Sequence, residues 1–180
     1  MHITIATGVQ LFVDIEGAGL VPDGAQMREK PTLILLHGGP GDNHSSFKPL
    51  FSALADVAQM VYVGHRGHGR SSRVSPEQWT LDTFADDVVR LCSALGIHKP
   101  IVLGQRFGGF VAQRYINRHP AHPGKVCPLQ DALDIAAALP ARWLQLVRFA
   151  NAGHGTWRDQ PEAAMARLRQ FITDPITAPA

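Results

Sequence analysis

The sequence predicts an α/β protein with a mostly parallel, doubly wound sheet and an N-terminal β-hairpin. The first observation is a period-two alternation of apolar residues near the N-terminus, which is typical of a strand with one buried face. The second is a set of three short apolar runs, each followed by a glycine-rich turn and a helical pattern. Runs that are apolar on both faces fit central parallel strands, so this alternation predicts helices on both faces of the sheet.

The hairpin is predicted from the first sixteen residues. Apolar side chains at Val9, Leu11, Val13 and Ile15 indicate one strand, and residues 3–6 are expected to pair with it. The segment 17–31 contains five Gly and Pro residues and is expected to be a loop.

Three strands and three helices follow in alternation. Strands are expected over residues 32–36, 60–63 and 101–103. The first helix is expected to start at Ser45 or Ser46 and to bury Phe47, Leu50, Phe51 and Leu54. The second runs from Thr80 to a closing Gly96, and the third covers residues 107–117.

The alternation breaks after the third helix. Residues 119–124 are expected to be a loop and residues 129–139 a helix, with Val126 and Cys127 too few to form a strand between them. Either a strand is hidden here or the sheet lacks one.

The C-terminal part is predicted to contain one strand and one helix. The strand is expected over residues 143–149. The helix is expected over 161–172, capped by Asp159, and residues 174–180 are expected to fray.

Composition narrows the class of protein. The chain has 180 residues, of which 45% are hydrophobic and 18% charged, which predicts one domain with its own core. A net charge of +2 without basic clusters gives no sign of nucleic-acid binding. No apolar run is long enough to span a membrane, and residues 1–8 lack the features of a signal peptide. Two cysteines fit a reducing cytoplasm, so a cytoplasmic protein is expected.

Glycine-rich segments follow the three apolar strands. They are HGGPG (37–41), GHRGHGRSS (64–72) and GQRFGG (104–109), with NAGHG (151–155) after the last predicted strand. Ligands bind outside the carboxyl ends of the strands in open parallel sheets, so these loops predict a site. The alternative is that each is only a tight strand-to-helix turn.

These segments resemble the α/β-hydrolase fold family, and most closely its proline iminopeptidase-like branch. The matching segments, in family order, are LLHGGPG, VYVGHRGHGRSS, VLGQRFGGFVAQRY and FANAGHGTWRDQPEAA. The resemblance implies serine-hydrolase ancestry, a small-molecule ester, amide or peptide substrate, and no cofactor.

The resemblance assigns the HGGPG segment to part of an oxyanion hole. On that basis Gly38 and Gly39 would supply backbone N–H donors. The backbone N–H of Phe107, after the third apolar strand, would be the second oxyanion donor. The alternative for HGGPG is a simple turn.

The nucleophile elbow of the family, G-x-S-x-G, corresponds to residues 104–108, where Arg106 stands in place of serine. A guanidinium stays protonated and cannot attack a carbonyl. Arg106 could bind a carboxylate, or it could fold out to solvent or block the pocket.

The remaining triad positions are His154 and an aspartate. His154 matches the catalytic base of the family. The resemblance implies that the sequence jumps near residues 124–126, from an early part of the family sequence to a part that follows the acid. The resemblance therefore implies one shortened domain over residues 1–173, which lacks the cap and about two strands. Asp131 and Asp134 lie on a predicted helix, where they are expected to be N-terminal helix charges.

Three histidines in the first two loops raise the question of a metal site. His37, His65 and His68 have no carboxylate or cysteine beside them, so no metal is expected. Arg66 and Ser71 are expected to brace the second loop.

Three functions remain open at this point. The main hypothesis is a hydrolase-family protein that is inactive as written. The alternatives are a non-catalytic protein that binds a small anion or a partner, and a deletion variant made for folding or assembly. If strands are missing, residues 143–149 must pair with 101–103 or leave an open edge, which predicts a dimer or a swapped oligomer.

Overall fold

The computed structural model describes residues 1–128, 147, 149, 152 and 155–175. Its strands are β1 (His2–Ala6), β2 (Val9–Glu16), β3 (Leu20–Asp23), β4 (Gln26–Glu29), β5 (Thr32–Leu36), β6 (Gln59–Val63), β7 (Ile101–Gly104) and β8 (Lys125–Pro128). The α-helices are α1 (Leu81–Leu95), α2 (Phe107–Arg118), α4 (Thr156–Asp159) and α5 (Pro161–Thr173). Short 3₁₀ helices are η1 (His44–Phe47), η2 (Leu50–Leu54) and η3 (Pro76–Gln78).

Among the described residues, six strands form one sheet in the order β1-β2-β6-β5-β7-β8. β1 pairs antiparallel with β2, and β2 pairs antiparallel with β6. The pairs β5–β6, β5–β7 and β7–β8 are parallel. The predicted N-terminal hairpin and mostly parallel sheet are therefore confirmed.

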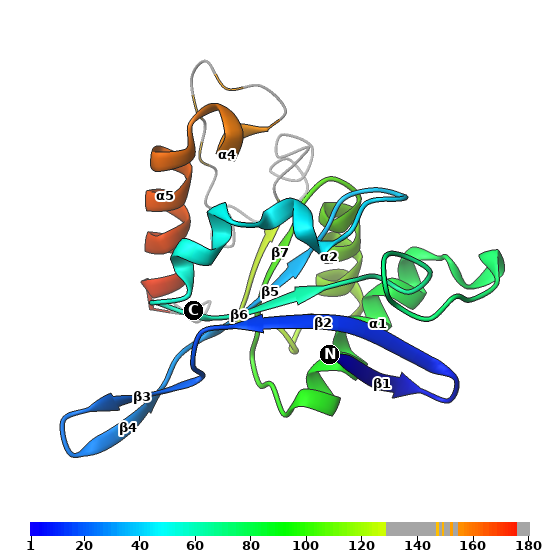
Figure 1. Ribbon diagram of the computed structural model, residues 1–180, viewed down its shortest axis with the longest axis horizontal. Helices are drawn as coiled ribbons and strands as arrows, with labels where there is room; N and C mark the ends of the chain where they lie inside the picture. Colours follow the sequence, from blue (N-terminus) through cyan, green and yellow to red (C-terminus); the bar gives the residue numbers. More distant parts are fainter. Residues whose placement is uncertain (129–146, 148, 150–151, 153–154, 176–180) are drawn as a thin grey trace.

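Both faces of the sheet are covered (Figure 1). On one face α1 and α2 pack on side chains that include Val13, Ile34 and Val102. On the other face η1, η2, α4 and α5 pack on side chains that include Leu33 and Leu103. The central strand β5 contributes to both cores because it is apolar on both sides, which agrees with its unbroken run of aliphatic residues.

The helix α1 has the caps that the sequence predicts. The hydroxyl of Thr80 accepts a hydrogen bond of 3.1 Å from the backbone N–H of Thr83. Gly96 closes the helix with a φ of 66°, a left-handed conformation that glycine adopts without steric cost.

The segment 17–31 is a hairpin and not the predicted loop. Strands β3 and β4 pair antiparallel, from Leu20 opposite Glu29 to Asp23 opposite Gln26. The ribbon projects away from the main sheet (Figure 1), and its residues are mostly exposed. Because neither face is buried, these strands carry no alternation of apolar and polar residues, and only the turn residues marked the region.

The single helix predicted from Ser45 or Ser46 is also wrong. The chain forms two 3₁₀ helices, and Asn43 caps the first by accepting a 2.8 Å hydrogen bond from the N–H of Ser45. Pro49 accounts for the break, because proline lacks an N–H and disfavours a helical residue before it. Lys48 is accordingly extended, with φ −92° and ψ 151°.

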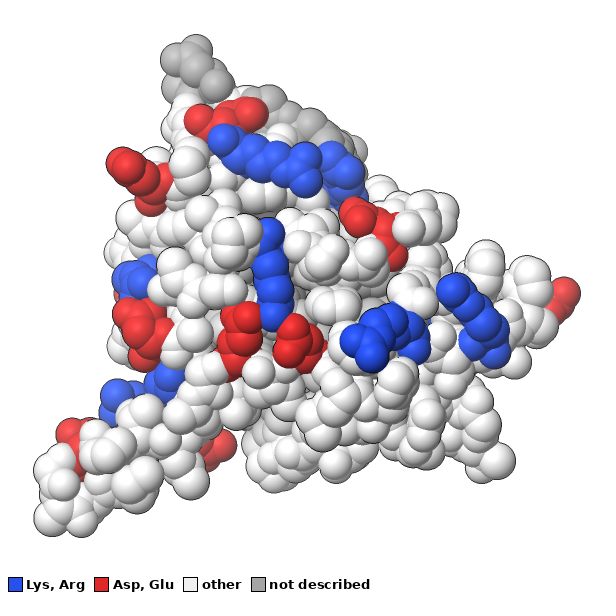
Figure 2. Space-filling model, viewed as in Figure 1, with Lys and Arg blue, Asp and Glu red and all other residues white. Residues whose placement is uncertain are grey.

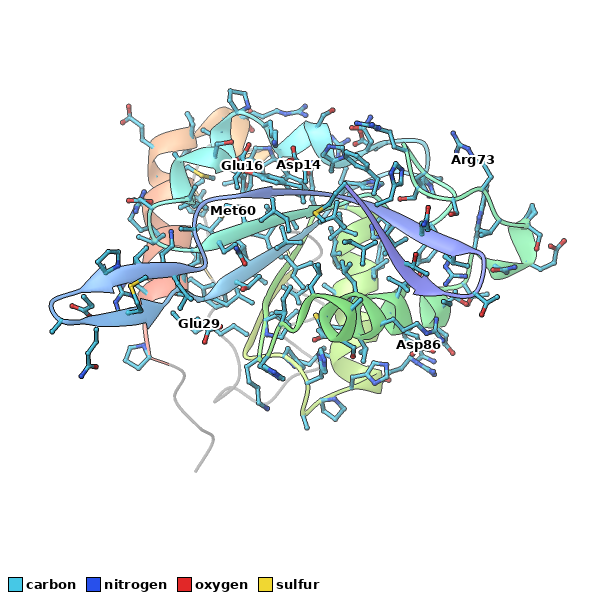
Figure 3. The ribbon with its side chains drawn as sticks, turned by 60° about the horizontal axis from the view of Figure 1, so that its bottom comes forward. Asp14, Glu16, Glu29, Met60, Arg73 and Asp86 are labelled. Carbon is cyan, nitrogen blue, oxygen red and sulfur yellow. The ribbon has the colours of Figure 1, made fainter. Side chains whose placement is uncertain are left out.

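Lys48 then ties this segment to the sheet. Its ammonium forms ion pairs with Asp14 and Glu16, which alternate along β2 and so share one face (Figure 3). The hydroxyl of Tyr62 on β6 donates to Glu16 at 2.9 Å. Two adjacent strands and the η1–η2 segment therefore meet in one polar cluster above the sheet.

A strand exists where none was predicted after α2. β8 lies parallel to β7, with Ile101 opposite Lys125 and Gly104 opposite Pro128. β8 is four residues long and, among the described strands, pairs only with β7. Its apolar run is too short to be recognised in the sequence. The junction expected near residues 124–126 falls where β8 begins.

This pairing also answers one part of the predicted topology. β7 has β5 on one side and β8 on the other, so both edges of residues 101–104 are occupied by described strands. The predicted helix at 129–139 and most of the predicted strand at 143–149 lie outside the described residues, as do residues 176–180.

The last helix begins at Pro161, as predicted, but its predicted cap residue is wrong. Asp159 ends α4, and Gln160 occupies the position before Pro161, the first residue of α5. Proline suits this first position because a backbone N–H there would have no acceptor within the helix, so its absence costs no hydrogen bond. α5 ends at Thr173, one residue beyond the predicted end of the helix.

The surface carries mixed charge. On the face shown in Figure 2, Lys and Arg side chains lie among Asp and Glu side chains, without a broad patch of one sign. In the part of the chain that the structure describes, every helix is too short or too polar to cross a membrane.

Candidate functional site at the carboxyl edge of the sheet

The three glycine-rich loops after β5, β6 and β7 meet at one edge of the sheet. The backbone N–H of His65, after β6, donates to Nε2 of His37, after β5, at 3.1 Å. The N–H of Gln105, after β7, donates to the carbonyl of Leu36 at 3.0 Å. The predicted gathering of these loops is confirmed.

The loop after β7 is a sharp turn between strand and helix. Arg106 has φ 51° and ψ −121°, a conformation that residues with a side chain rarely adopt. Glycines on both sides allow the close approach: a Cβ at Gly104 would lie 2.0 Å from the carbonyl oxygen of Gly108. A Cβ at Gly108 would lie 2.0 Å from the carbonyl oxygen of Leu36, so α2 begins in direct backbone contact with β5.

Arg106 sits at the apex of this turn and lies against the first loop. A Cβ placed on Gly38 would be 3.1 Å from Cδ of Arg106. The Nε atom of Arg106 is buried without a hydrogen-bond partner, and no ion pair joins Arg106 to an acidic residue in the described part of the chain. The preceding Gln105 is fully buried, and both atoms of its amide lack a partner.

The residues expected to form an oxyanion hole lie beside this apex. Gly38 is buried and Gly39 is partly buried, and Gly39 has φ 122°, which only glycine adopts readily. Phe107 is the first residue of α2, where the N–H has no acceptor within the helix. The backbone here can present donors to an oxygen atom, although no hydrogen bond in the described residues shows one in use.

The three histidines form a packed cluster. The ring centroids of His37 and His65 are 4.4 Å apart, and those of His37 and His68 are 5.8 Å apart. The ring of Phe84 packs on those of His65 and His68, with ring centroids 5.4 and 6.3 Å apart. Burial lowers the pKa of His37 to about 4 and places the pKa of His65 well below its usual value, so both rings are neutral at pH 7.

The histidine cluster does not offer a metal site in the described residues. Nowhere among them do three or more His, Cys, Asp or Glu side chains come together in a way that could hold a metal ion. Nδ1 of His37 contacts the Gly38 carbonyl and Nδ1 of His68 contacts the Arg66 carbonyl, so these nitrogens serve the backbone.

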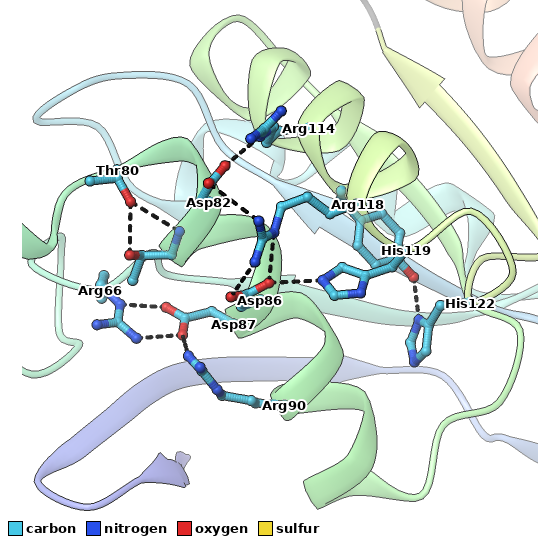
Figure 4. A network of polar contacts seen from close by, with 12 residues as sticks. Arg66, Thr80, Asp82, Asp86, Asp87, Arg90, Arg114, Arg118, His119 and His122 are labelled. Atoms are coloured by element: carbon cyan, nitrogen blue, oxygen red, sulfur yellow. Dashed lines mark hydrogen bonds and ion pairs between the residues drawn. The ribbon is translucent and has the colours of Figure 1, made fainter.

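Arg66 and Ser71 brace the second loop, as predicted. Arg66 binds Asp87 of α1 through two of its nitrogens (Figure 4). It also donates to Gln78 at 2.9 Å. Ser71 donates to the carbonyl of Gly64 at 2.7 Å and accepts from the N–H of Phe12 at 2.8 Å. The loop is thereby fastened to α1 on one side and to β2 on the other.

A second polar network joins α1 to α2 on the surface. Asp82 contacts Arg114 and Arg118, and Asp86 contacts Arg118 and His119 (Figure 4). These groups are partly exposed and lie along the two helices, so they support the helix that starts at the elbow.

The remaining candidates cannot be placed. His154, Asp131 and Asp134 lie outside the described residues. Sequence reasoning overlooked the buried amide of Gln105 and the hydrogen bonds between His37 and His65. The H-x-x-H spacing draws attention to these histidines as possible metal ligands, but it does not predict their hydrogen bonds to one another.

Comparison with known proteins adds a family. A family model described as alpha/beta hydrolase fold matches residues 31–160. A proline iminopeptidase of Pestalotiopsis fici is 39% identical over 114 residues, which are 62% of this chain and 40% of that protein. A proline iminopeptidase of Clostridium botulinum is 34% identical over 87 residues, which are 48% of this chain and 30% of that protein.

A solved structure agrees. The crystal structure of a proline iminopeptidase-related protein from Thermus thermophilus superimposes with a TM-score of 0.58 and 29% identity, covering 67% of this chain and 40% of the other. The chain thus spans between 30% and 40% of the length of these three proteins, consistent with a shortened domain. With a family model that covers most of its length, this chain belongs to the α/β-hydrolase fold family.

Proposed function

We propose that this chain keeps the substrate-site scaffold of a serine hydrolase of the proline iminopeptidase kind but has no nucleophile, and so does not hydrolyse esters or amides at an enzyme's rate. The observation that carries the proposal is Arg106 at the apex of the strand-to-helix turn, with φ 51° and glycines at 104 and 108. In a G-x-S-x-G elbow this position holds the attacking serine.

The chemistry follows from the residue types. A serine hydroxyl at the apex would attack a carbonyl once a base removed its proton, and N–H groups of Gly38, Gly39 and Phe107 would stabilise the oxyanion. A guanidinium is already protonated and has no lone pair to form that bond. His154, at the proposed base position, then has no hydroxyl to deprotonate. Loss of a nucleophile alone removes several orders of magnitude from the rate of a serine hydrolase.

Turnover measurements test this proposal. p-Nitrophenyl acetate and a proline aryl-amide are the substrates, with the Arg106→Ser variant as comparison. We expect no turnover by the unmodified chain above that of the buffer. Turnover by the unmodified chain that disappears in His154→Ala would contradict the proposal, because it would show a working base with another nucleophile.

A second candidate is binding of a small carboxylate at the same place. It is favoured by the lack of an acidic partner for Arg106 in the described residues, and by its position at the N-terminus of α2, where the helix dipole favours an anion. Isothermal titration with acetate and with proline tests it, and Arg106→Gln is the control. Heat that is the same for both proteins would remove this candidate.

Association through a sheet edge stays a prediction. Among the described residues β1 and β8 are the outer strands of the sheet. An outer strand with free backbone groups can pair with a second copy. Light scattering over a range of concentrations tests this, and a monomer throughout would count against it.

A further inference from the structure

His37 and His65 are joined by two hydrogen bonds that run in opposite directions. The backbone N–H of His65 donates to Nε2 of the His37 ring at 3.1 Å. Nε2 of the His65 ring lies 3.3 Å from the backbone carbonyl oxygen of His37, to which it donates. His37 is fully buried and His65 is 4% exposed, so water does not compete for these bonds.

The first bond decides which nitrogen of His37 carries the proton. A neutral imidazole has one N–H and one nitrogen with a free lone pair. Because Nε2 accepts from a backbone N–H, the proton must be on Nδ1. Nδ1 lies 2.6 Å from the carbonyl oxygen of Gly38, which can only accept, so Nδ1–H donates to it.

This second bond fixes the plane of the peptide between Gly38 and Gly39. In a planar trans peptide the C=O and the following N–H point in opposite directions. With the carbonyl of Gly38 turned towards His37, the N–H of Gly39 is turned away from it. Two successive glycines have little conformational preference of their own, so a side chain that holds the carbonyl determines the direction of this N–H.

We propose that His37, held by His65, is a positioning residue that aims the N–H of Gly39 at a ligand oxygen bound beside Arg106. A Cβ placed on Gly38 would lie 3.1 Å from Cδ of Arg106, so the side chain of Arg106 lies directly beside this glycine at the apex of the elbow. The ligand class is an anionic or strongly polarised oxygen, as in a carboxylate or a tetrahedral oxyanion. The inference rests on the proposed function only in taking this edge as the ligand site.

These hydrogen bonds are made by two side chains, His37 and His65, that the proposed hydrolase chemistry does not use. Both ring nitrogens of His37, and Nε2 of His65, form their hydrogen bonds with backbone groups. Their role is geometric, and it can therefore be separated from turnover.

The test is nuclear magnetic resonance of the full chain labelled with ¹⁵N. The ring nitrogens of His37 report its tautomer directly, and we expect a protonated Nδ1 and an unprotonated Nε2 at pH 7. A His37 ring protonated on Nε2 would overturn the proposal. This measurement needs no substitution, and it holds whether or not the chain hydrolyses an ester.

Two variants separate positioning from folding. His37→Asn keeps an N–H donor close to the place of Nδ1, whereas His37→Phe fills the site without a donor. We expect the amide signal of Gly39 to stay near its original position in His37→Asn and to shift in His37→Phe. An unshifted signal in folded His37→Phe, or equal shifts in both variants, would overturn the proposal. If His37→Phe does not fold, the tautomer and the Asn variant still decide.

Discussion

Arg66 and Asp87 form a bidentate ion pair that is almost completely buried, with Arg66 4% and Asp87 3% exposed. The pair joins the loop after β6 to the middle of α1. The carboxylate also accepts from Arg90 at 3.2 Å, and Arg66 also reaches Gln78. With both groups supplied with partners, the pair fixes the loop that carries His65 and His68 without leaving a charge unmatched.

Removing one member of this pair should be costly. Arg66→Met or Asp87→Ala leaves a buried charge without its partner, and we expect the free energy of unfolding to fall by about 3–5 kcal/mol. Urea denaturation followed by circular dichroism measures the change. The double variant Arg66→Met/Asp87→Leu should lose less than either single variant, because no charge remains buried.

An exposed ion pair provides the control. Arg169 contacts Asp56 at 2.6 Å, and Asp56 is 64% exposed. Arg169→Ala should lower the free energy of unfolding by about 0–1 kcal/mol. A loss in Arg66→Met no larger than that in Arg169→Ala would show that the buried pair does not matter.

Gly108 should tolerate no side chain. Its substitution by alanine would place Cβ 2.0 Å from the carbonyl oxygen of Leu36, so α2 must move away from β5. We expect Gly108→Ala to lose at least 2 kcal/mol, roughly the cost of overpacking a core, or to fail to fold.

The adjacent glycine is the matched control. At Gly109 the nearest atom to a new Cβ lies 3.5 Å away, which is ordinary contact. Alanine favours a helix over glycine by up to about 1 kcal/mol, so Gly109→Ala should be neutral or stabilising. Thermal unfolding compares the two variants, and similar melting temperatures would rule out the close approach at Gly108.

The parts of the fold that could be predicted are those in which burial or capping leaves a local mark. β5 was recognisable because Leu33 to Leu36 are all fully buried, and α1 because Thr80 and Gly96 cap it. β3, β4 and β8 left no such mark. Each is four residues long and is defined by its partner strand, which the local sequence does not contain.

The same distinction applies to the candidate site. The turn around Arg106 could be predicted because glycines at 104 and 108 must stand at fixed positions. The contacts between His37 and His65 could not, because these residues are 28 positions apart and meet only because β5 and β6 are neighbours. From the sequence, these histidines could be judged only as metal ligands, which were not expected, and the hydrogen bonds of the His37 ring to backbone groups could not be foreseen.

Acid should destabilise the protein through the buried histidines. In the folded chain burial lowers the pKa of His37 from 6.5 to about 4, with His68 and His44 nearby and Asp42 opposing them. Between these values the unfolded chain binds a proton that the folded chain does not, so stability is complete above about pH 6.5 and falls as the pH decreases towards 4. At about 1.4 kcal/mol for each pH unit between them, the loss from His37 alone is roughly 3 kcal/mol.

The free energy of unfolding at pH 7.5 and pH 5 measures the part of this loss that falls above pH 5, which is about 2 kcal/mol. The His37→Asn variant has the same carboxylates but lacks the buried imidazole, so it should lose less stability on acidification. His65, whose pKa is also lowered by burial and by His37 and His68, keeps part of the effect in that variant. Equal losses in both proteins would show that His37 does not contribute.

The backbone of Arg106 should cost stability that glycine recovers. A residue with a side chain at φ 51° and ψ −121° is held in a sparsely populated region, at a cost of about 1–3 kcal/mol. Arg106→Ala keeps that cost and removes only the guanidinium and its stem, whereas Arg106→Gly removes both. We expect Arg106→Gly to be more stable than Arg106→Ala by about 1 kcal/mol, after allowing for the greater freedom of glycine in the unfolded chain. Urea denaturation of the two variants isolates the backbone term. If alanine is the more stable of the two, the turn is unstrained, and the geometry that links it to a nucleophile elbow loses its support.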